Sequence, residues 1–170
     1  TDLYIDRPDT ADIGLFGYVD GGTVNNTVVE NANITGDFEV GGLVGVNRDG
    51  RVTDSYATGN VSVLGARGGG LVGTNRGTVT ESHATANVSV PDGSNAAGGL
   101  VGDNVGTINR SYATGDVITD TNSNRVGGLV GQNDGTVEMS HATGNVSGGD
   151  DKIGGLVGLA FSGSVTESYA

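Results

Sequence analysis

Residues 41–63 read GGLVGVNRDGRVTDSYATGNVSV, and versions of this stretch recur along most of the chain. The anchor of the repeat is GGLVG, which begins at residues 41, 69, 98, 127 and 154, with a divergent copy, IGLFG, at 13–17. The second glycine of the anchor falls at positions 14, 42, 70, 99, 128 and 155, so the period is 27 to 29 residues. A period this constant indicates a repeat architecture.

The residues between anchors predict strands and turns. Glycine and β-branched residues disfavour helix, and no apolar period near 3.6 residues appears. Short apolar runs separated by Gly, Asn and Asp are typical of strands joined by turns. A propeller blade needs about 40 residues or more, so the shorter period favours one coil of a parallel β-helix with two or three short strands.

The sequence therefore predicts an all-β, right-handed parallel β-helix (β-solenoid) of about six coils, since parallel crossovers are almost always right-handed. The solenoid covers residues 13–170, with coils one to six starting near residues 13, 41, 69, 98, 127 and 154. Residues 1–12 form a lead-in that we expect to cap the first coil in part. Because residue 170 falls within a repeat, we expect the chain to be a fragment of a longer protein.

Stacked coils place equivalent residues above one another at a spacing of about 4.8 Å. Like residues should then form buried columns that no single coil could bury alone. The leucine column contains Leu15, Leu43, Leu71, Leu100, Leu129 and Leu156. A second column contains Val24, Val52, Val79, Ile108, Val137 and Val165, and a third contains Val61, Val88, Val117 and Val146.

One turn of each middle coil carries an asparagine, which predicts a ladder of side-chain amides like those in cross-β structures. The ladder residues are Asn47, Asn75, Asn104 and Asn133. Val19 and Ala160 replace asparagine in the end coils, so the ladder should be confined to the middle. The anchor glycines are expected at corners where φ is positive or where two backbones approach closely.

The charge balance limits the partners of the chain. Twenty Asp and Glu stand against eight Lys and Arg, which gives a net charge of −12. This excess disfavours nucleic acid and anionic membranes as partners. Most of the acids are aspartate and Lys152 is the only lysine, which favours a protein of a salt-adapted organism. No run of 18 apolar residues exists, so we expect no membrane insertion in this segment.

The repeat closely resembles the GLUG repeat of large bacterial and archaeal surface proteins, including adhesin-like ones. The resemblance rests on GGLVGxN-x-GxV-xx-SYATGxVS in residues 41–62 and on its later copies, and it covers nearly the whole chain. Residues 3–8 and 13–17 also resemble the lead-in that precedes the first repeat. The resemblance implies secretion to the cell surface and a role in adhesion or surface structure.

Two candidate surfaces follow from the predicted columns. Alternating tyrosine and histidine form an outward aromatic ladder of Tyr56, His83, Tyr112, His141 and Tyr169. Cross-strand stacking that covers the coil explains this ladder, and a sugar-binding strip is the functional alternative. Threonines two residues later share the same face, and their regular array would also suit ice binding; they are Thr58, Thr85, Thr114 and Thr143.

Catalytic, cofactor and metal sites are not predicted. Catalysis needs a localised cluster of groups in a cleft, whereas acids such as Asp54 and Glu81 recur along one repeat position. The two histidines lie two coils, or about 9.6 Å, apart, too far to share a zinc ion. Asp134, Asp150 and Asp151 could bind calcium but are explained as solvated turn acids.

Six Asn-x-Ser/Thr sequences are possible N-glycosylation sites. They begin at Asn25, Asn33, Asn60, Asn87, Asn109 and Asn145. Asn60, Asn87 and Asn145 share one repeat position and would line one edge of the rod. Asparagine is also a preferred turn residue, which explains this pattern without modification.

These observations predict a rigid spacer or adhesive stalk segment of a secreted or cell-surface protein, and not an enzyme. The alternative is a carbohydrate-binding surface that uses the Tyr/His ladder; a polysaccharide-acting enzyme or an ice-binding protein is less favoured. Expected partners are surface glycans or further copies joined end to end. Loop variation is concentrated at 64–67, 91–97, 118–126 and 148–153, which are the segments expected to contact a partner.

Overall fold

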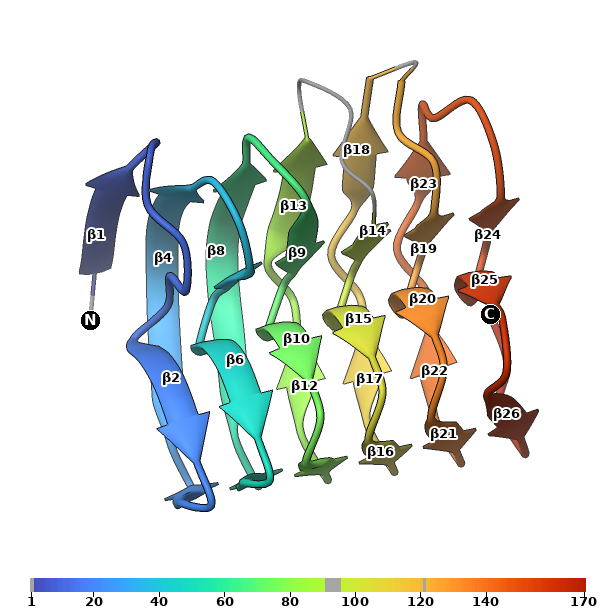
Figure 1. The fold of residues 1–170 in the computed structure, drawn as a ribbon, viewed down its shortest axis with the longest axis horizontal. Coiled ribbons are helices and arrows are strands. Elements are labelled where there is room, and N and C mark those ends of the chain that lie inside the picture. Colours follow the sequence, from blue (N-terminus) through green and yellow to red (C-terminus); the bar gives the residue numbers. More distant parts are fainter. Residues whose placement is uncertain (1, 91–95, 121) are drawn as a thin grey trace.

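A computed structural model describes residues 2–90, 96–120 and 122–170 and shows a single stack of coils built from β-strands (Figure 1). The strands form four parallel sheets that run along the stack, numbered here in the order in which each coil visits them. The described part of the chain contains no helix long and apolar enough to cross a membrane.

Each sheet gathers the equivalent segments of successive coils. Sheet 1 contains β5 (Val40–Gly41), β9 (Arg67–Gly69), β14 (Ala96–Gly98), β19 (Val126–Gly127) and β24 (Ile153–Gly154). Sheet 2 contains β2 (Phe16–Asp20), β6 (Val44–Arg48), β10 (Val72–Asn75), β15 (Val101–Asn104), β20 (Val130–Asn133) and β25 (Val157–Ala160). Sheet 3 contains β3 (Thr23–Asn25), β7 (Arg51–Thr53), β11 (Thr78–Thr80), β16 (Thr107–Asn109), β21 (Thr136–Glu138) and β26 (Ser164–Thr166).

Sheet 4 is the longest and forms the face opposite sheet 2. It contains β1 (Asp2–Arg7), β4 (Val28–Gly36), β8 (Tyr56–Val63), β12 (His83–Ala84), β13 (Asn87–Val90), β17 (Tyr112–Ala113), β18 (Val117–Thr119), β22 (His141–Ala142) and β23 (Val146–Ser147). In Figure 1 the front strands β2 and β6 run downward, the strands β4 and β8 behind them run upward, and the chain advances from left to right. The coils therefore wind in the right-handed sense that the sequence predicted.

The register of the sheets confirms the predicted stacking. Val72 pairs in parallel with Val44 on one side and with Val101 on the other, one repeat away in each direction. The predicted number of strands was too low, because each complete coil contributes to all four sheets. The lead-in adds β1, which pairs in parallel with β4 and packs Leu3 and Ile5 against the core.

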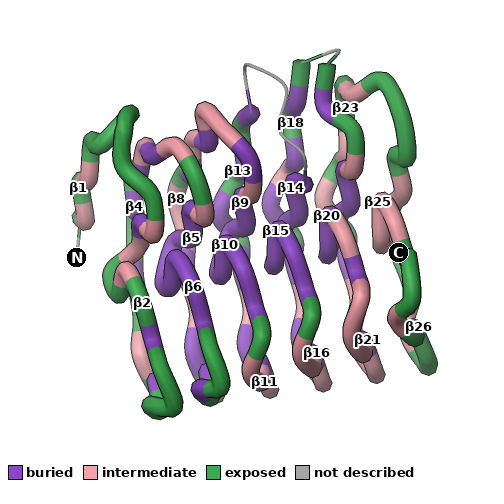
Figure 2. The backbone as a smooth tube through the Cα atoms, viewed as in Figure 1, coloured by how far each residue is buried: buried purple, intermediate pink, exposed green. Residues whose placement is uncertain are grey.

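The predicted columns are buried in the middle coils and open at the ends (Figure 2). Leu43, Leu71, Leu100 and Leu129 have no exposed surface. By contrast, Leu15 is 42% exposed and Val165 is 37% exposed. The expectation that Leu15 and Val165 are buried was wrong, since each lies in an end coil and has a neighbouring coil on one side, although Val24 of coil one is buried.

The buried asparagine ladder is present and continuous through four coils. The Nδ2 group of Asn47 donates to Oδ1 of Asn75 over 2.8 Å, Asn75 donates to Asn104 over 2.8 Å, and Asn104 donates to Asn133 over 2.7 Å. All four asparagines are fully buried. Val19 pairs with Asn47 at the first rung and leaves the buried Oδ1 of Asn47 without a hydrogen-bond donor.

The anchor glycines are needed for close backbone approach and not for positive φ. A Cβ atom added to Gly42 would lie 2.3 Å from the carbonyl oxygen of Gly70 and 2.9 Å from Cβ of Ala57. Among the described glycines, φ is positive at Gly21, Gly59, Gly148 and Gly149, none of which belongs to an anchor. Of the two alternatives expected at the anchors, close backbone approach is therefore the one found.

A column of residues other than glycine has left-handed backbone at the corner between sheets 3 and 4. The residues of this left-handed column have φ between 47° and 50°, and they are Asn26, Asp54, Glu81, Arg110, Met139 and Glu167. A residue with a Cβ atom pays about 1–2 kcal/mol in this conformation, and asparagine tolerates it best after glycine. The sharp turn ends each strand of sheet 3, which helps to explain why the coils have more strands than expected.

We predict that Asn75→Ala lowers the free energy of unfolding by about 2–4 kcal/mol, because it removes two buried amide hydrogen bonds of about 1–2 kcal/mol each and leaves Oδ1 of Asn104 without its donor. Urea denaturation followed by circular dichroism measures the change. The matched control is Asn60→Ala on the exposed surface, which should change the free energy by less than about 0.5 kcal/mol. Equal losses in the two variants would contradict the ladder.

We predict that Met139→Asn is more stable than Met139→Ala by about 0.5–1 kcal/mol, since both remove the methionine side chain but only asparagine suits φ near 48°. Thermal unfolding of the two variants under one condition gives the comparison. A more stable alanine variant would show that the corner does not carry left-handed strain.

Candidate functional site

Residues of sheet 4 point alternately into the core and outward, and this alternation creates a highly regular surface. In β8, Ala57 and Val61 point into the core while Tyr56 and Asn60 point outward. The inward alanines lie against anchor glycines, as Ala57 does against Gly42, so the coil is thin here. Since every coil repeats this pattern in register, outward residues of one kind form columns along the rod.

The predicted ring column forms a continuous aromatic stack. Neighbouring ring centroids are 4.6 to 5.1 Å apart, and the ring planes differ by 4° to 11°. The stacked rings are Tyr56, His83, Tyr112, His141 and Tyr169. Val28 pairs with Tyr56 and continues the column into coil one.

The stack covers the ring faces and leaves the ring edges open. Sugars bind to aromatic platforms through the ring face, which carries the electron-rich π surface. Here each inner ring is covered by a ring on both sides. Of the two end rings, Tyr56 is followed by Val28 in coil one, and Tyr169 is 62% exposed. A sugar-binding strip that uses the Tyr/His ladder therefore gains no support from the ring geometry.

Burial within the stack lowers the pKa of the His83 imidazole. His83 lies between Tyr56 and Tyr112, at centroid distances of 4.8 and 4.6 Å, and it is half-buried. Removal of surrounding water disfavours the charged imidazolium. The folded protein therefore favours neutral histidine at this rung.

A threonine column and an amide column run beside the rings. Thr85, Thr114 and Thr143 are exposed and Thr58 is half-exposed, as the sequence predicted. The amide column contains Asn33, Asn60, Asn87, Asp116 and Asn145. Its side chains are tied across the rungs: the backbone N–H of Asp116 donates to Oδ1 of Asn87 over 3.0 Å, and Nδ2 of Asn145 donates to Oδ1 of Asp116 over 3.0 Å.

Four of the six predicted glycosylation sequences therefore share one column, because the register adds Asn33 to the three that repeat spacing had aligned. Asn25 lies exposed at the end of β3. Asn109 is half-buried and its Nδ2 donates to Glu138 over 2.9 Å, while the hydroxyl of Ser111 two residues later is hydrogen-bonded inside the coil. Glycan occupancy at these sites stays a prediction.

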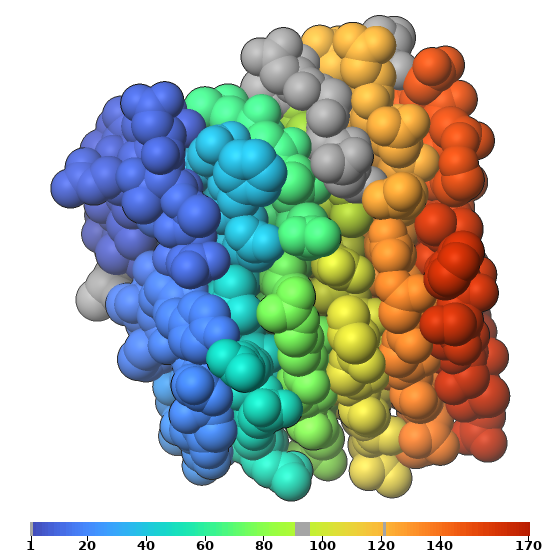
Figure 3. Space-filling view, viewed as in Figure 1, coloured from blue at the N-terminus to red at the C-terminus, as the bar shows by residue number. Residues whose placement is uncertain are grey.

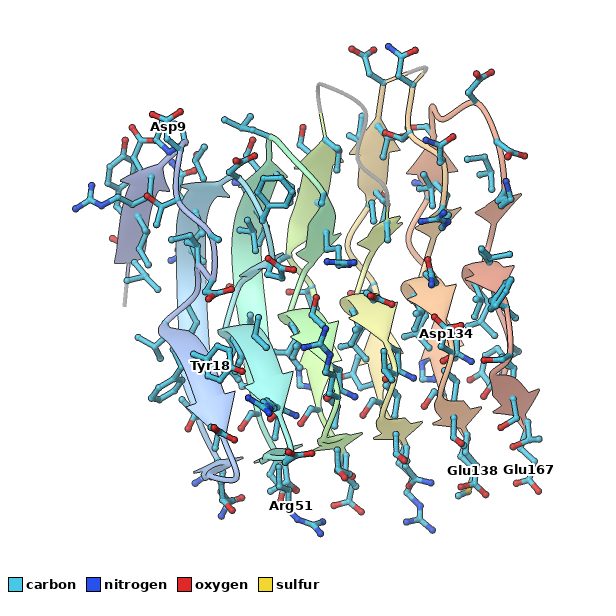
Figure 4. The ribbon with its side chains drawn as sticks, in the orientation of Figure 1. Asp9, Tyr18, Arg51, Asp134, Glu138 and Glu167 are labelled. Atoms are coloured by element: carbon cyan, nitrogen blue, oxygen red, sulfur yellow. The ribbon has the colours of Figure 1, made fainter. Side chains whose placement is uncertain are left out.

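The acids considered for catalysis and calcium lie at separate places. Asp54 and Glu81 belong to the left-handed column, whereas Asp134 follows β20 and accepts a hydrogen bond from Gln132 (Figure 4). Asp151 is paired with Lys152 in the loop before β24. Over the described ranges there is neither a pocket nor a group of three or more side chains able to hold a metal ion.

A cluster of charged residues that the repeat pattern does not predict joins three coils beside sheet 1. Arg67 donates from Nη1 to Glu39 over 2.8 Å and from Nε to Asp103 over 3.0 Å. Asp103 is 6% exposed, and burial raises the pKa of its carboxyl while Arg67 offsets part of that effect. One feature of the sequence could have indicated this cluster. The small residue Ala96, which pairs with Arg67, interrupts a column of long polar residues in sheet 1.

The described parts of the variable loops lie at the upper end of the coils, above sheets 1 and 4 in Figure 1 and along the upper rim of Figure 3. Within them, Leu64 and Gly65 donate backbone hydrogen bonds to the loop of the preceding coil. Residues 91–95 and 121 of the predicted partner-contacting loops lie outside the described residues. Contact of these loops with a partner stays a prediction.

We predict that the folded protein loses stability as the pH falls from about 7 to 5.5, through the ordinary histidine pKa of about 6.5. Because the pKa of His83 is lowered in the folded state, the unfolded chain binds the proton first and is favoured in this window. NMR titration should give His83 a pKa below that of a free histidine. The variant His83→Tyr keeps the ring stack but cannot bind this proton, so its melting temperature should depend less on pH. An unchanged pH dependence in that variant would count against this assignment.

Comparison with known proteins agrees with the geometry of the repeat. The GLUG motif matches at residues 36–62 and 122–147, each of which spans parts of two successive coils. Halomucin of the halophilic archaeon Haloquadratum walsbyi is 43% identical over 75 residues, which cover 44% of this chain but only 1% of that protein's length. No solved structure matches the chain. The chain therefore carries the GLUG motif at these two places, within a repeat that continues in register through the other coils.

Proposed function

We propose that the chain is a rigid spacer segment of a cell-surface protein. The observation that carries this proposal is the parallel register, in which coils two to five are hydrogen-bonded to one another in all four sheets. The backbone hydrogen bonds of a parallel stack lie along the rod axis, so stretching or bending the rod strains many bonds at once.

Length is the property that such a design controls. Each coil adds one strand spacing of about 4.8 Å without requiring a new core, because every column is simply extended by one more residue. The buried asparagine ladder and the aromatic stack extend by the same rule. A protein built in this way can vary its reach by the number of coils.

A location at the cell surface is supported by the GLUG repeats and by the halomucin relative. The net charge of −12 and the single lysine fit a protein that remains soluble in concentrated salt. A non-enzymatic role agrees with the even distribution of acids along the coils.

We predict that tandem insertion of three further copies of residues 41–68 lengthens the rod by about 14 Å, at one strand spacing per coil. Small-angle X-ray scattering measures the maximum dimension and the cross-sectional radius separately. The length should increase while the radius stays constant. A larger cross-section with no gain in length would rule out the spacer geometry.

We predict that raising NaCl from 0.1 to 2 M increases the melting temperature by several degrees, because salt screens repulsion between the excess acids. The matched variant is Asp54→Asn with Glu81→Gln, which removes two like charges from neighbouring rungs of one column. Its melting temperature should depend less on salt. A wild-type melting temperature that falls with salt would argue against adaptation to salt.

A further inference from the structure

The outward side of sheet 4 is almost free of charge in coils two to five, although the chain carries 28 charged residues, eight basic and 20 acidic. We call this surface the neutral face. It consists of the ring column, the threonine column, the amide column and a fourth column at its edge. Its outward residues are Tyr56, Thr58, Asn60, Ser62, His83, Thr85, Asn87, Ser89, Tyr112, Thr114, Asp116, Ile118, His141, Thr143, Asn145 and Ser147.

Asp116 is the only Asp, Glu, Lys or Arg among these described residues, and it is half-buried. Its Oδ1 accepts hydrogen bonds from both the backbone N–H and Nδ2 of Asn145, over 2.8 and 3.0 Å. The other surfaces carry the charge: Arg48 and Asp134 flank sheet 2, and Glu81 and Arg110 lie at the left-handed corner. The neutral face therefore differs in kind from the rest of this acidic molecule.

A charge-free surface avoids the cost of stripping water from ions when a partner covers it. The face offers hydroxyl and amide groups in rows about 4.8 Å apart along the rod and about 6.6 Å apart across it, bordered by the edges of the stacked rings. We infer that the neutral face binds a neutral polysaccharide strand, whose hydroxyl groups can donate to and accept from these rows. The ring faces, which are covered, take no part.

The size and charge of the surface favour this occupant over a second copy of the chain. Four coils span about 19 Å and seven residues of strand span about 23 Å, so the face covers roughly 440 Å². A stable dimer buries about 800 Å² on each partner. A second copy would also bring a further net charge of −12 close to the first. A narrow neutral polymer can bind to this smaller area, and it brings no charge that the acidic chain would repel.

Affinity gel electrophoresis of the 170-residue chain, produced without glycosylation, tests the inference with soluble dextran, glucomannan and galactomannan as neutral probes and alginate as an acidic one. At least one neutral polysaccharide should retard the protein, and alginate should not. Thr85→Glu with Thr114→Glu places two charges in the centre of the face and should weaken binding about tenfold or more, because bound glutamates would lose their water.

The matched control is Thr107→Glu with Thr136→Glu, which adds the same charges to half-exposed threonines of sheet 3 and should bind as the wild type does. Circular dichroism confirms that both variants are folded. No retardation by any neutral probe, or equal weakening in both variants, would overturn the inference. Sedimentation that shows a wild-type dimer and a monomeric Thr85→Glu/Thr114→Glu variant would assign the face to self-association instead. None of these outcomes bears on rod length, so the spacer proposal is tested independently.

Discussion

Every feature of this protein depends on one constraint: each residue lies one strand spacing above its counterpart in the preceding coil. The constraint is set by backbone hydrogen bonds between parallel strands, such as those between β6, β10 and β15. This constraint lets a sequence with few large side chains form a core, because leucine packs on leucine and valine on valine from coil to coil. It also explains the glycines, since corners such as Gly42 and Gly70 leave no room for a Cβ atom between successive coils.

The same constraint gives the exterior its pattern. Side chains repeated at one strand spacing must tolerate their own kind as neighbours, which stacked aromatic rings, amides and hydroxyls do well. Like charges repel one another at this spacing. Asp54 and Glu81 do occupy adjacent rungs, but they lie at an exposed corner where water screens their charges. The alternation of tyrosine with histidine keeps the rings stacked while it varies their polarity. The ring column is thus better suited to covering the rod than to presenting ring faces to a ligand.

Much of the fold could be predicted from the sequence because the period alone determines which residues meet. The spacing of the GGLVG anchors gave the parallel register, the leucine and valine columns and the asparagine ladder. What could not be predicted depends on residues that do not repeat. Left-handed backbone at Met139 or Glu81 has no signal in residue type, and the pairing of Arg67 with Glu39 and Asp103 joins positions that differ between coils. The neutral face could be predicted only in part. Repeat spacing aligned its ring and threonine columns, but its lack of charge became clear only when the structure placed all outward positions of sheet 4 together.

The buried amides also give the rod a direction. Each Nδ2 points toward the coil that follows and each Oδ1 toward the coil that precedes, from Asn47 through to Asn133. A turn of chain stacked in the opposite sense would bring donor against donor or acceptor against acceptor inside the core. Coils can therefore be gained or lost only in the same orientation. The two ends of the ladder are chemically distinct, because Oδ1 of Asn47 faces coil one and Nδ2 of Asn133 donates to the carbonyl oxygen of Ser164 in coil six.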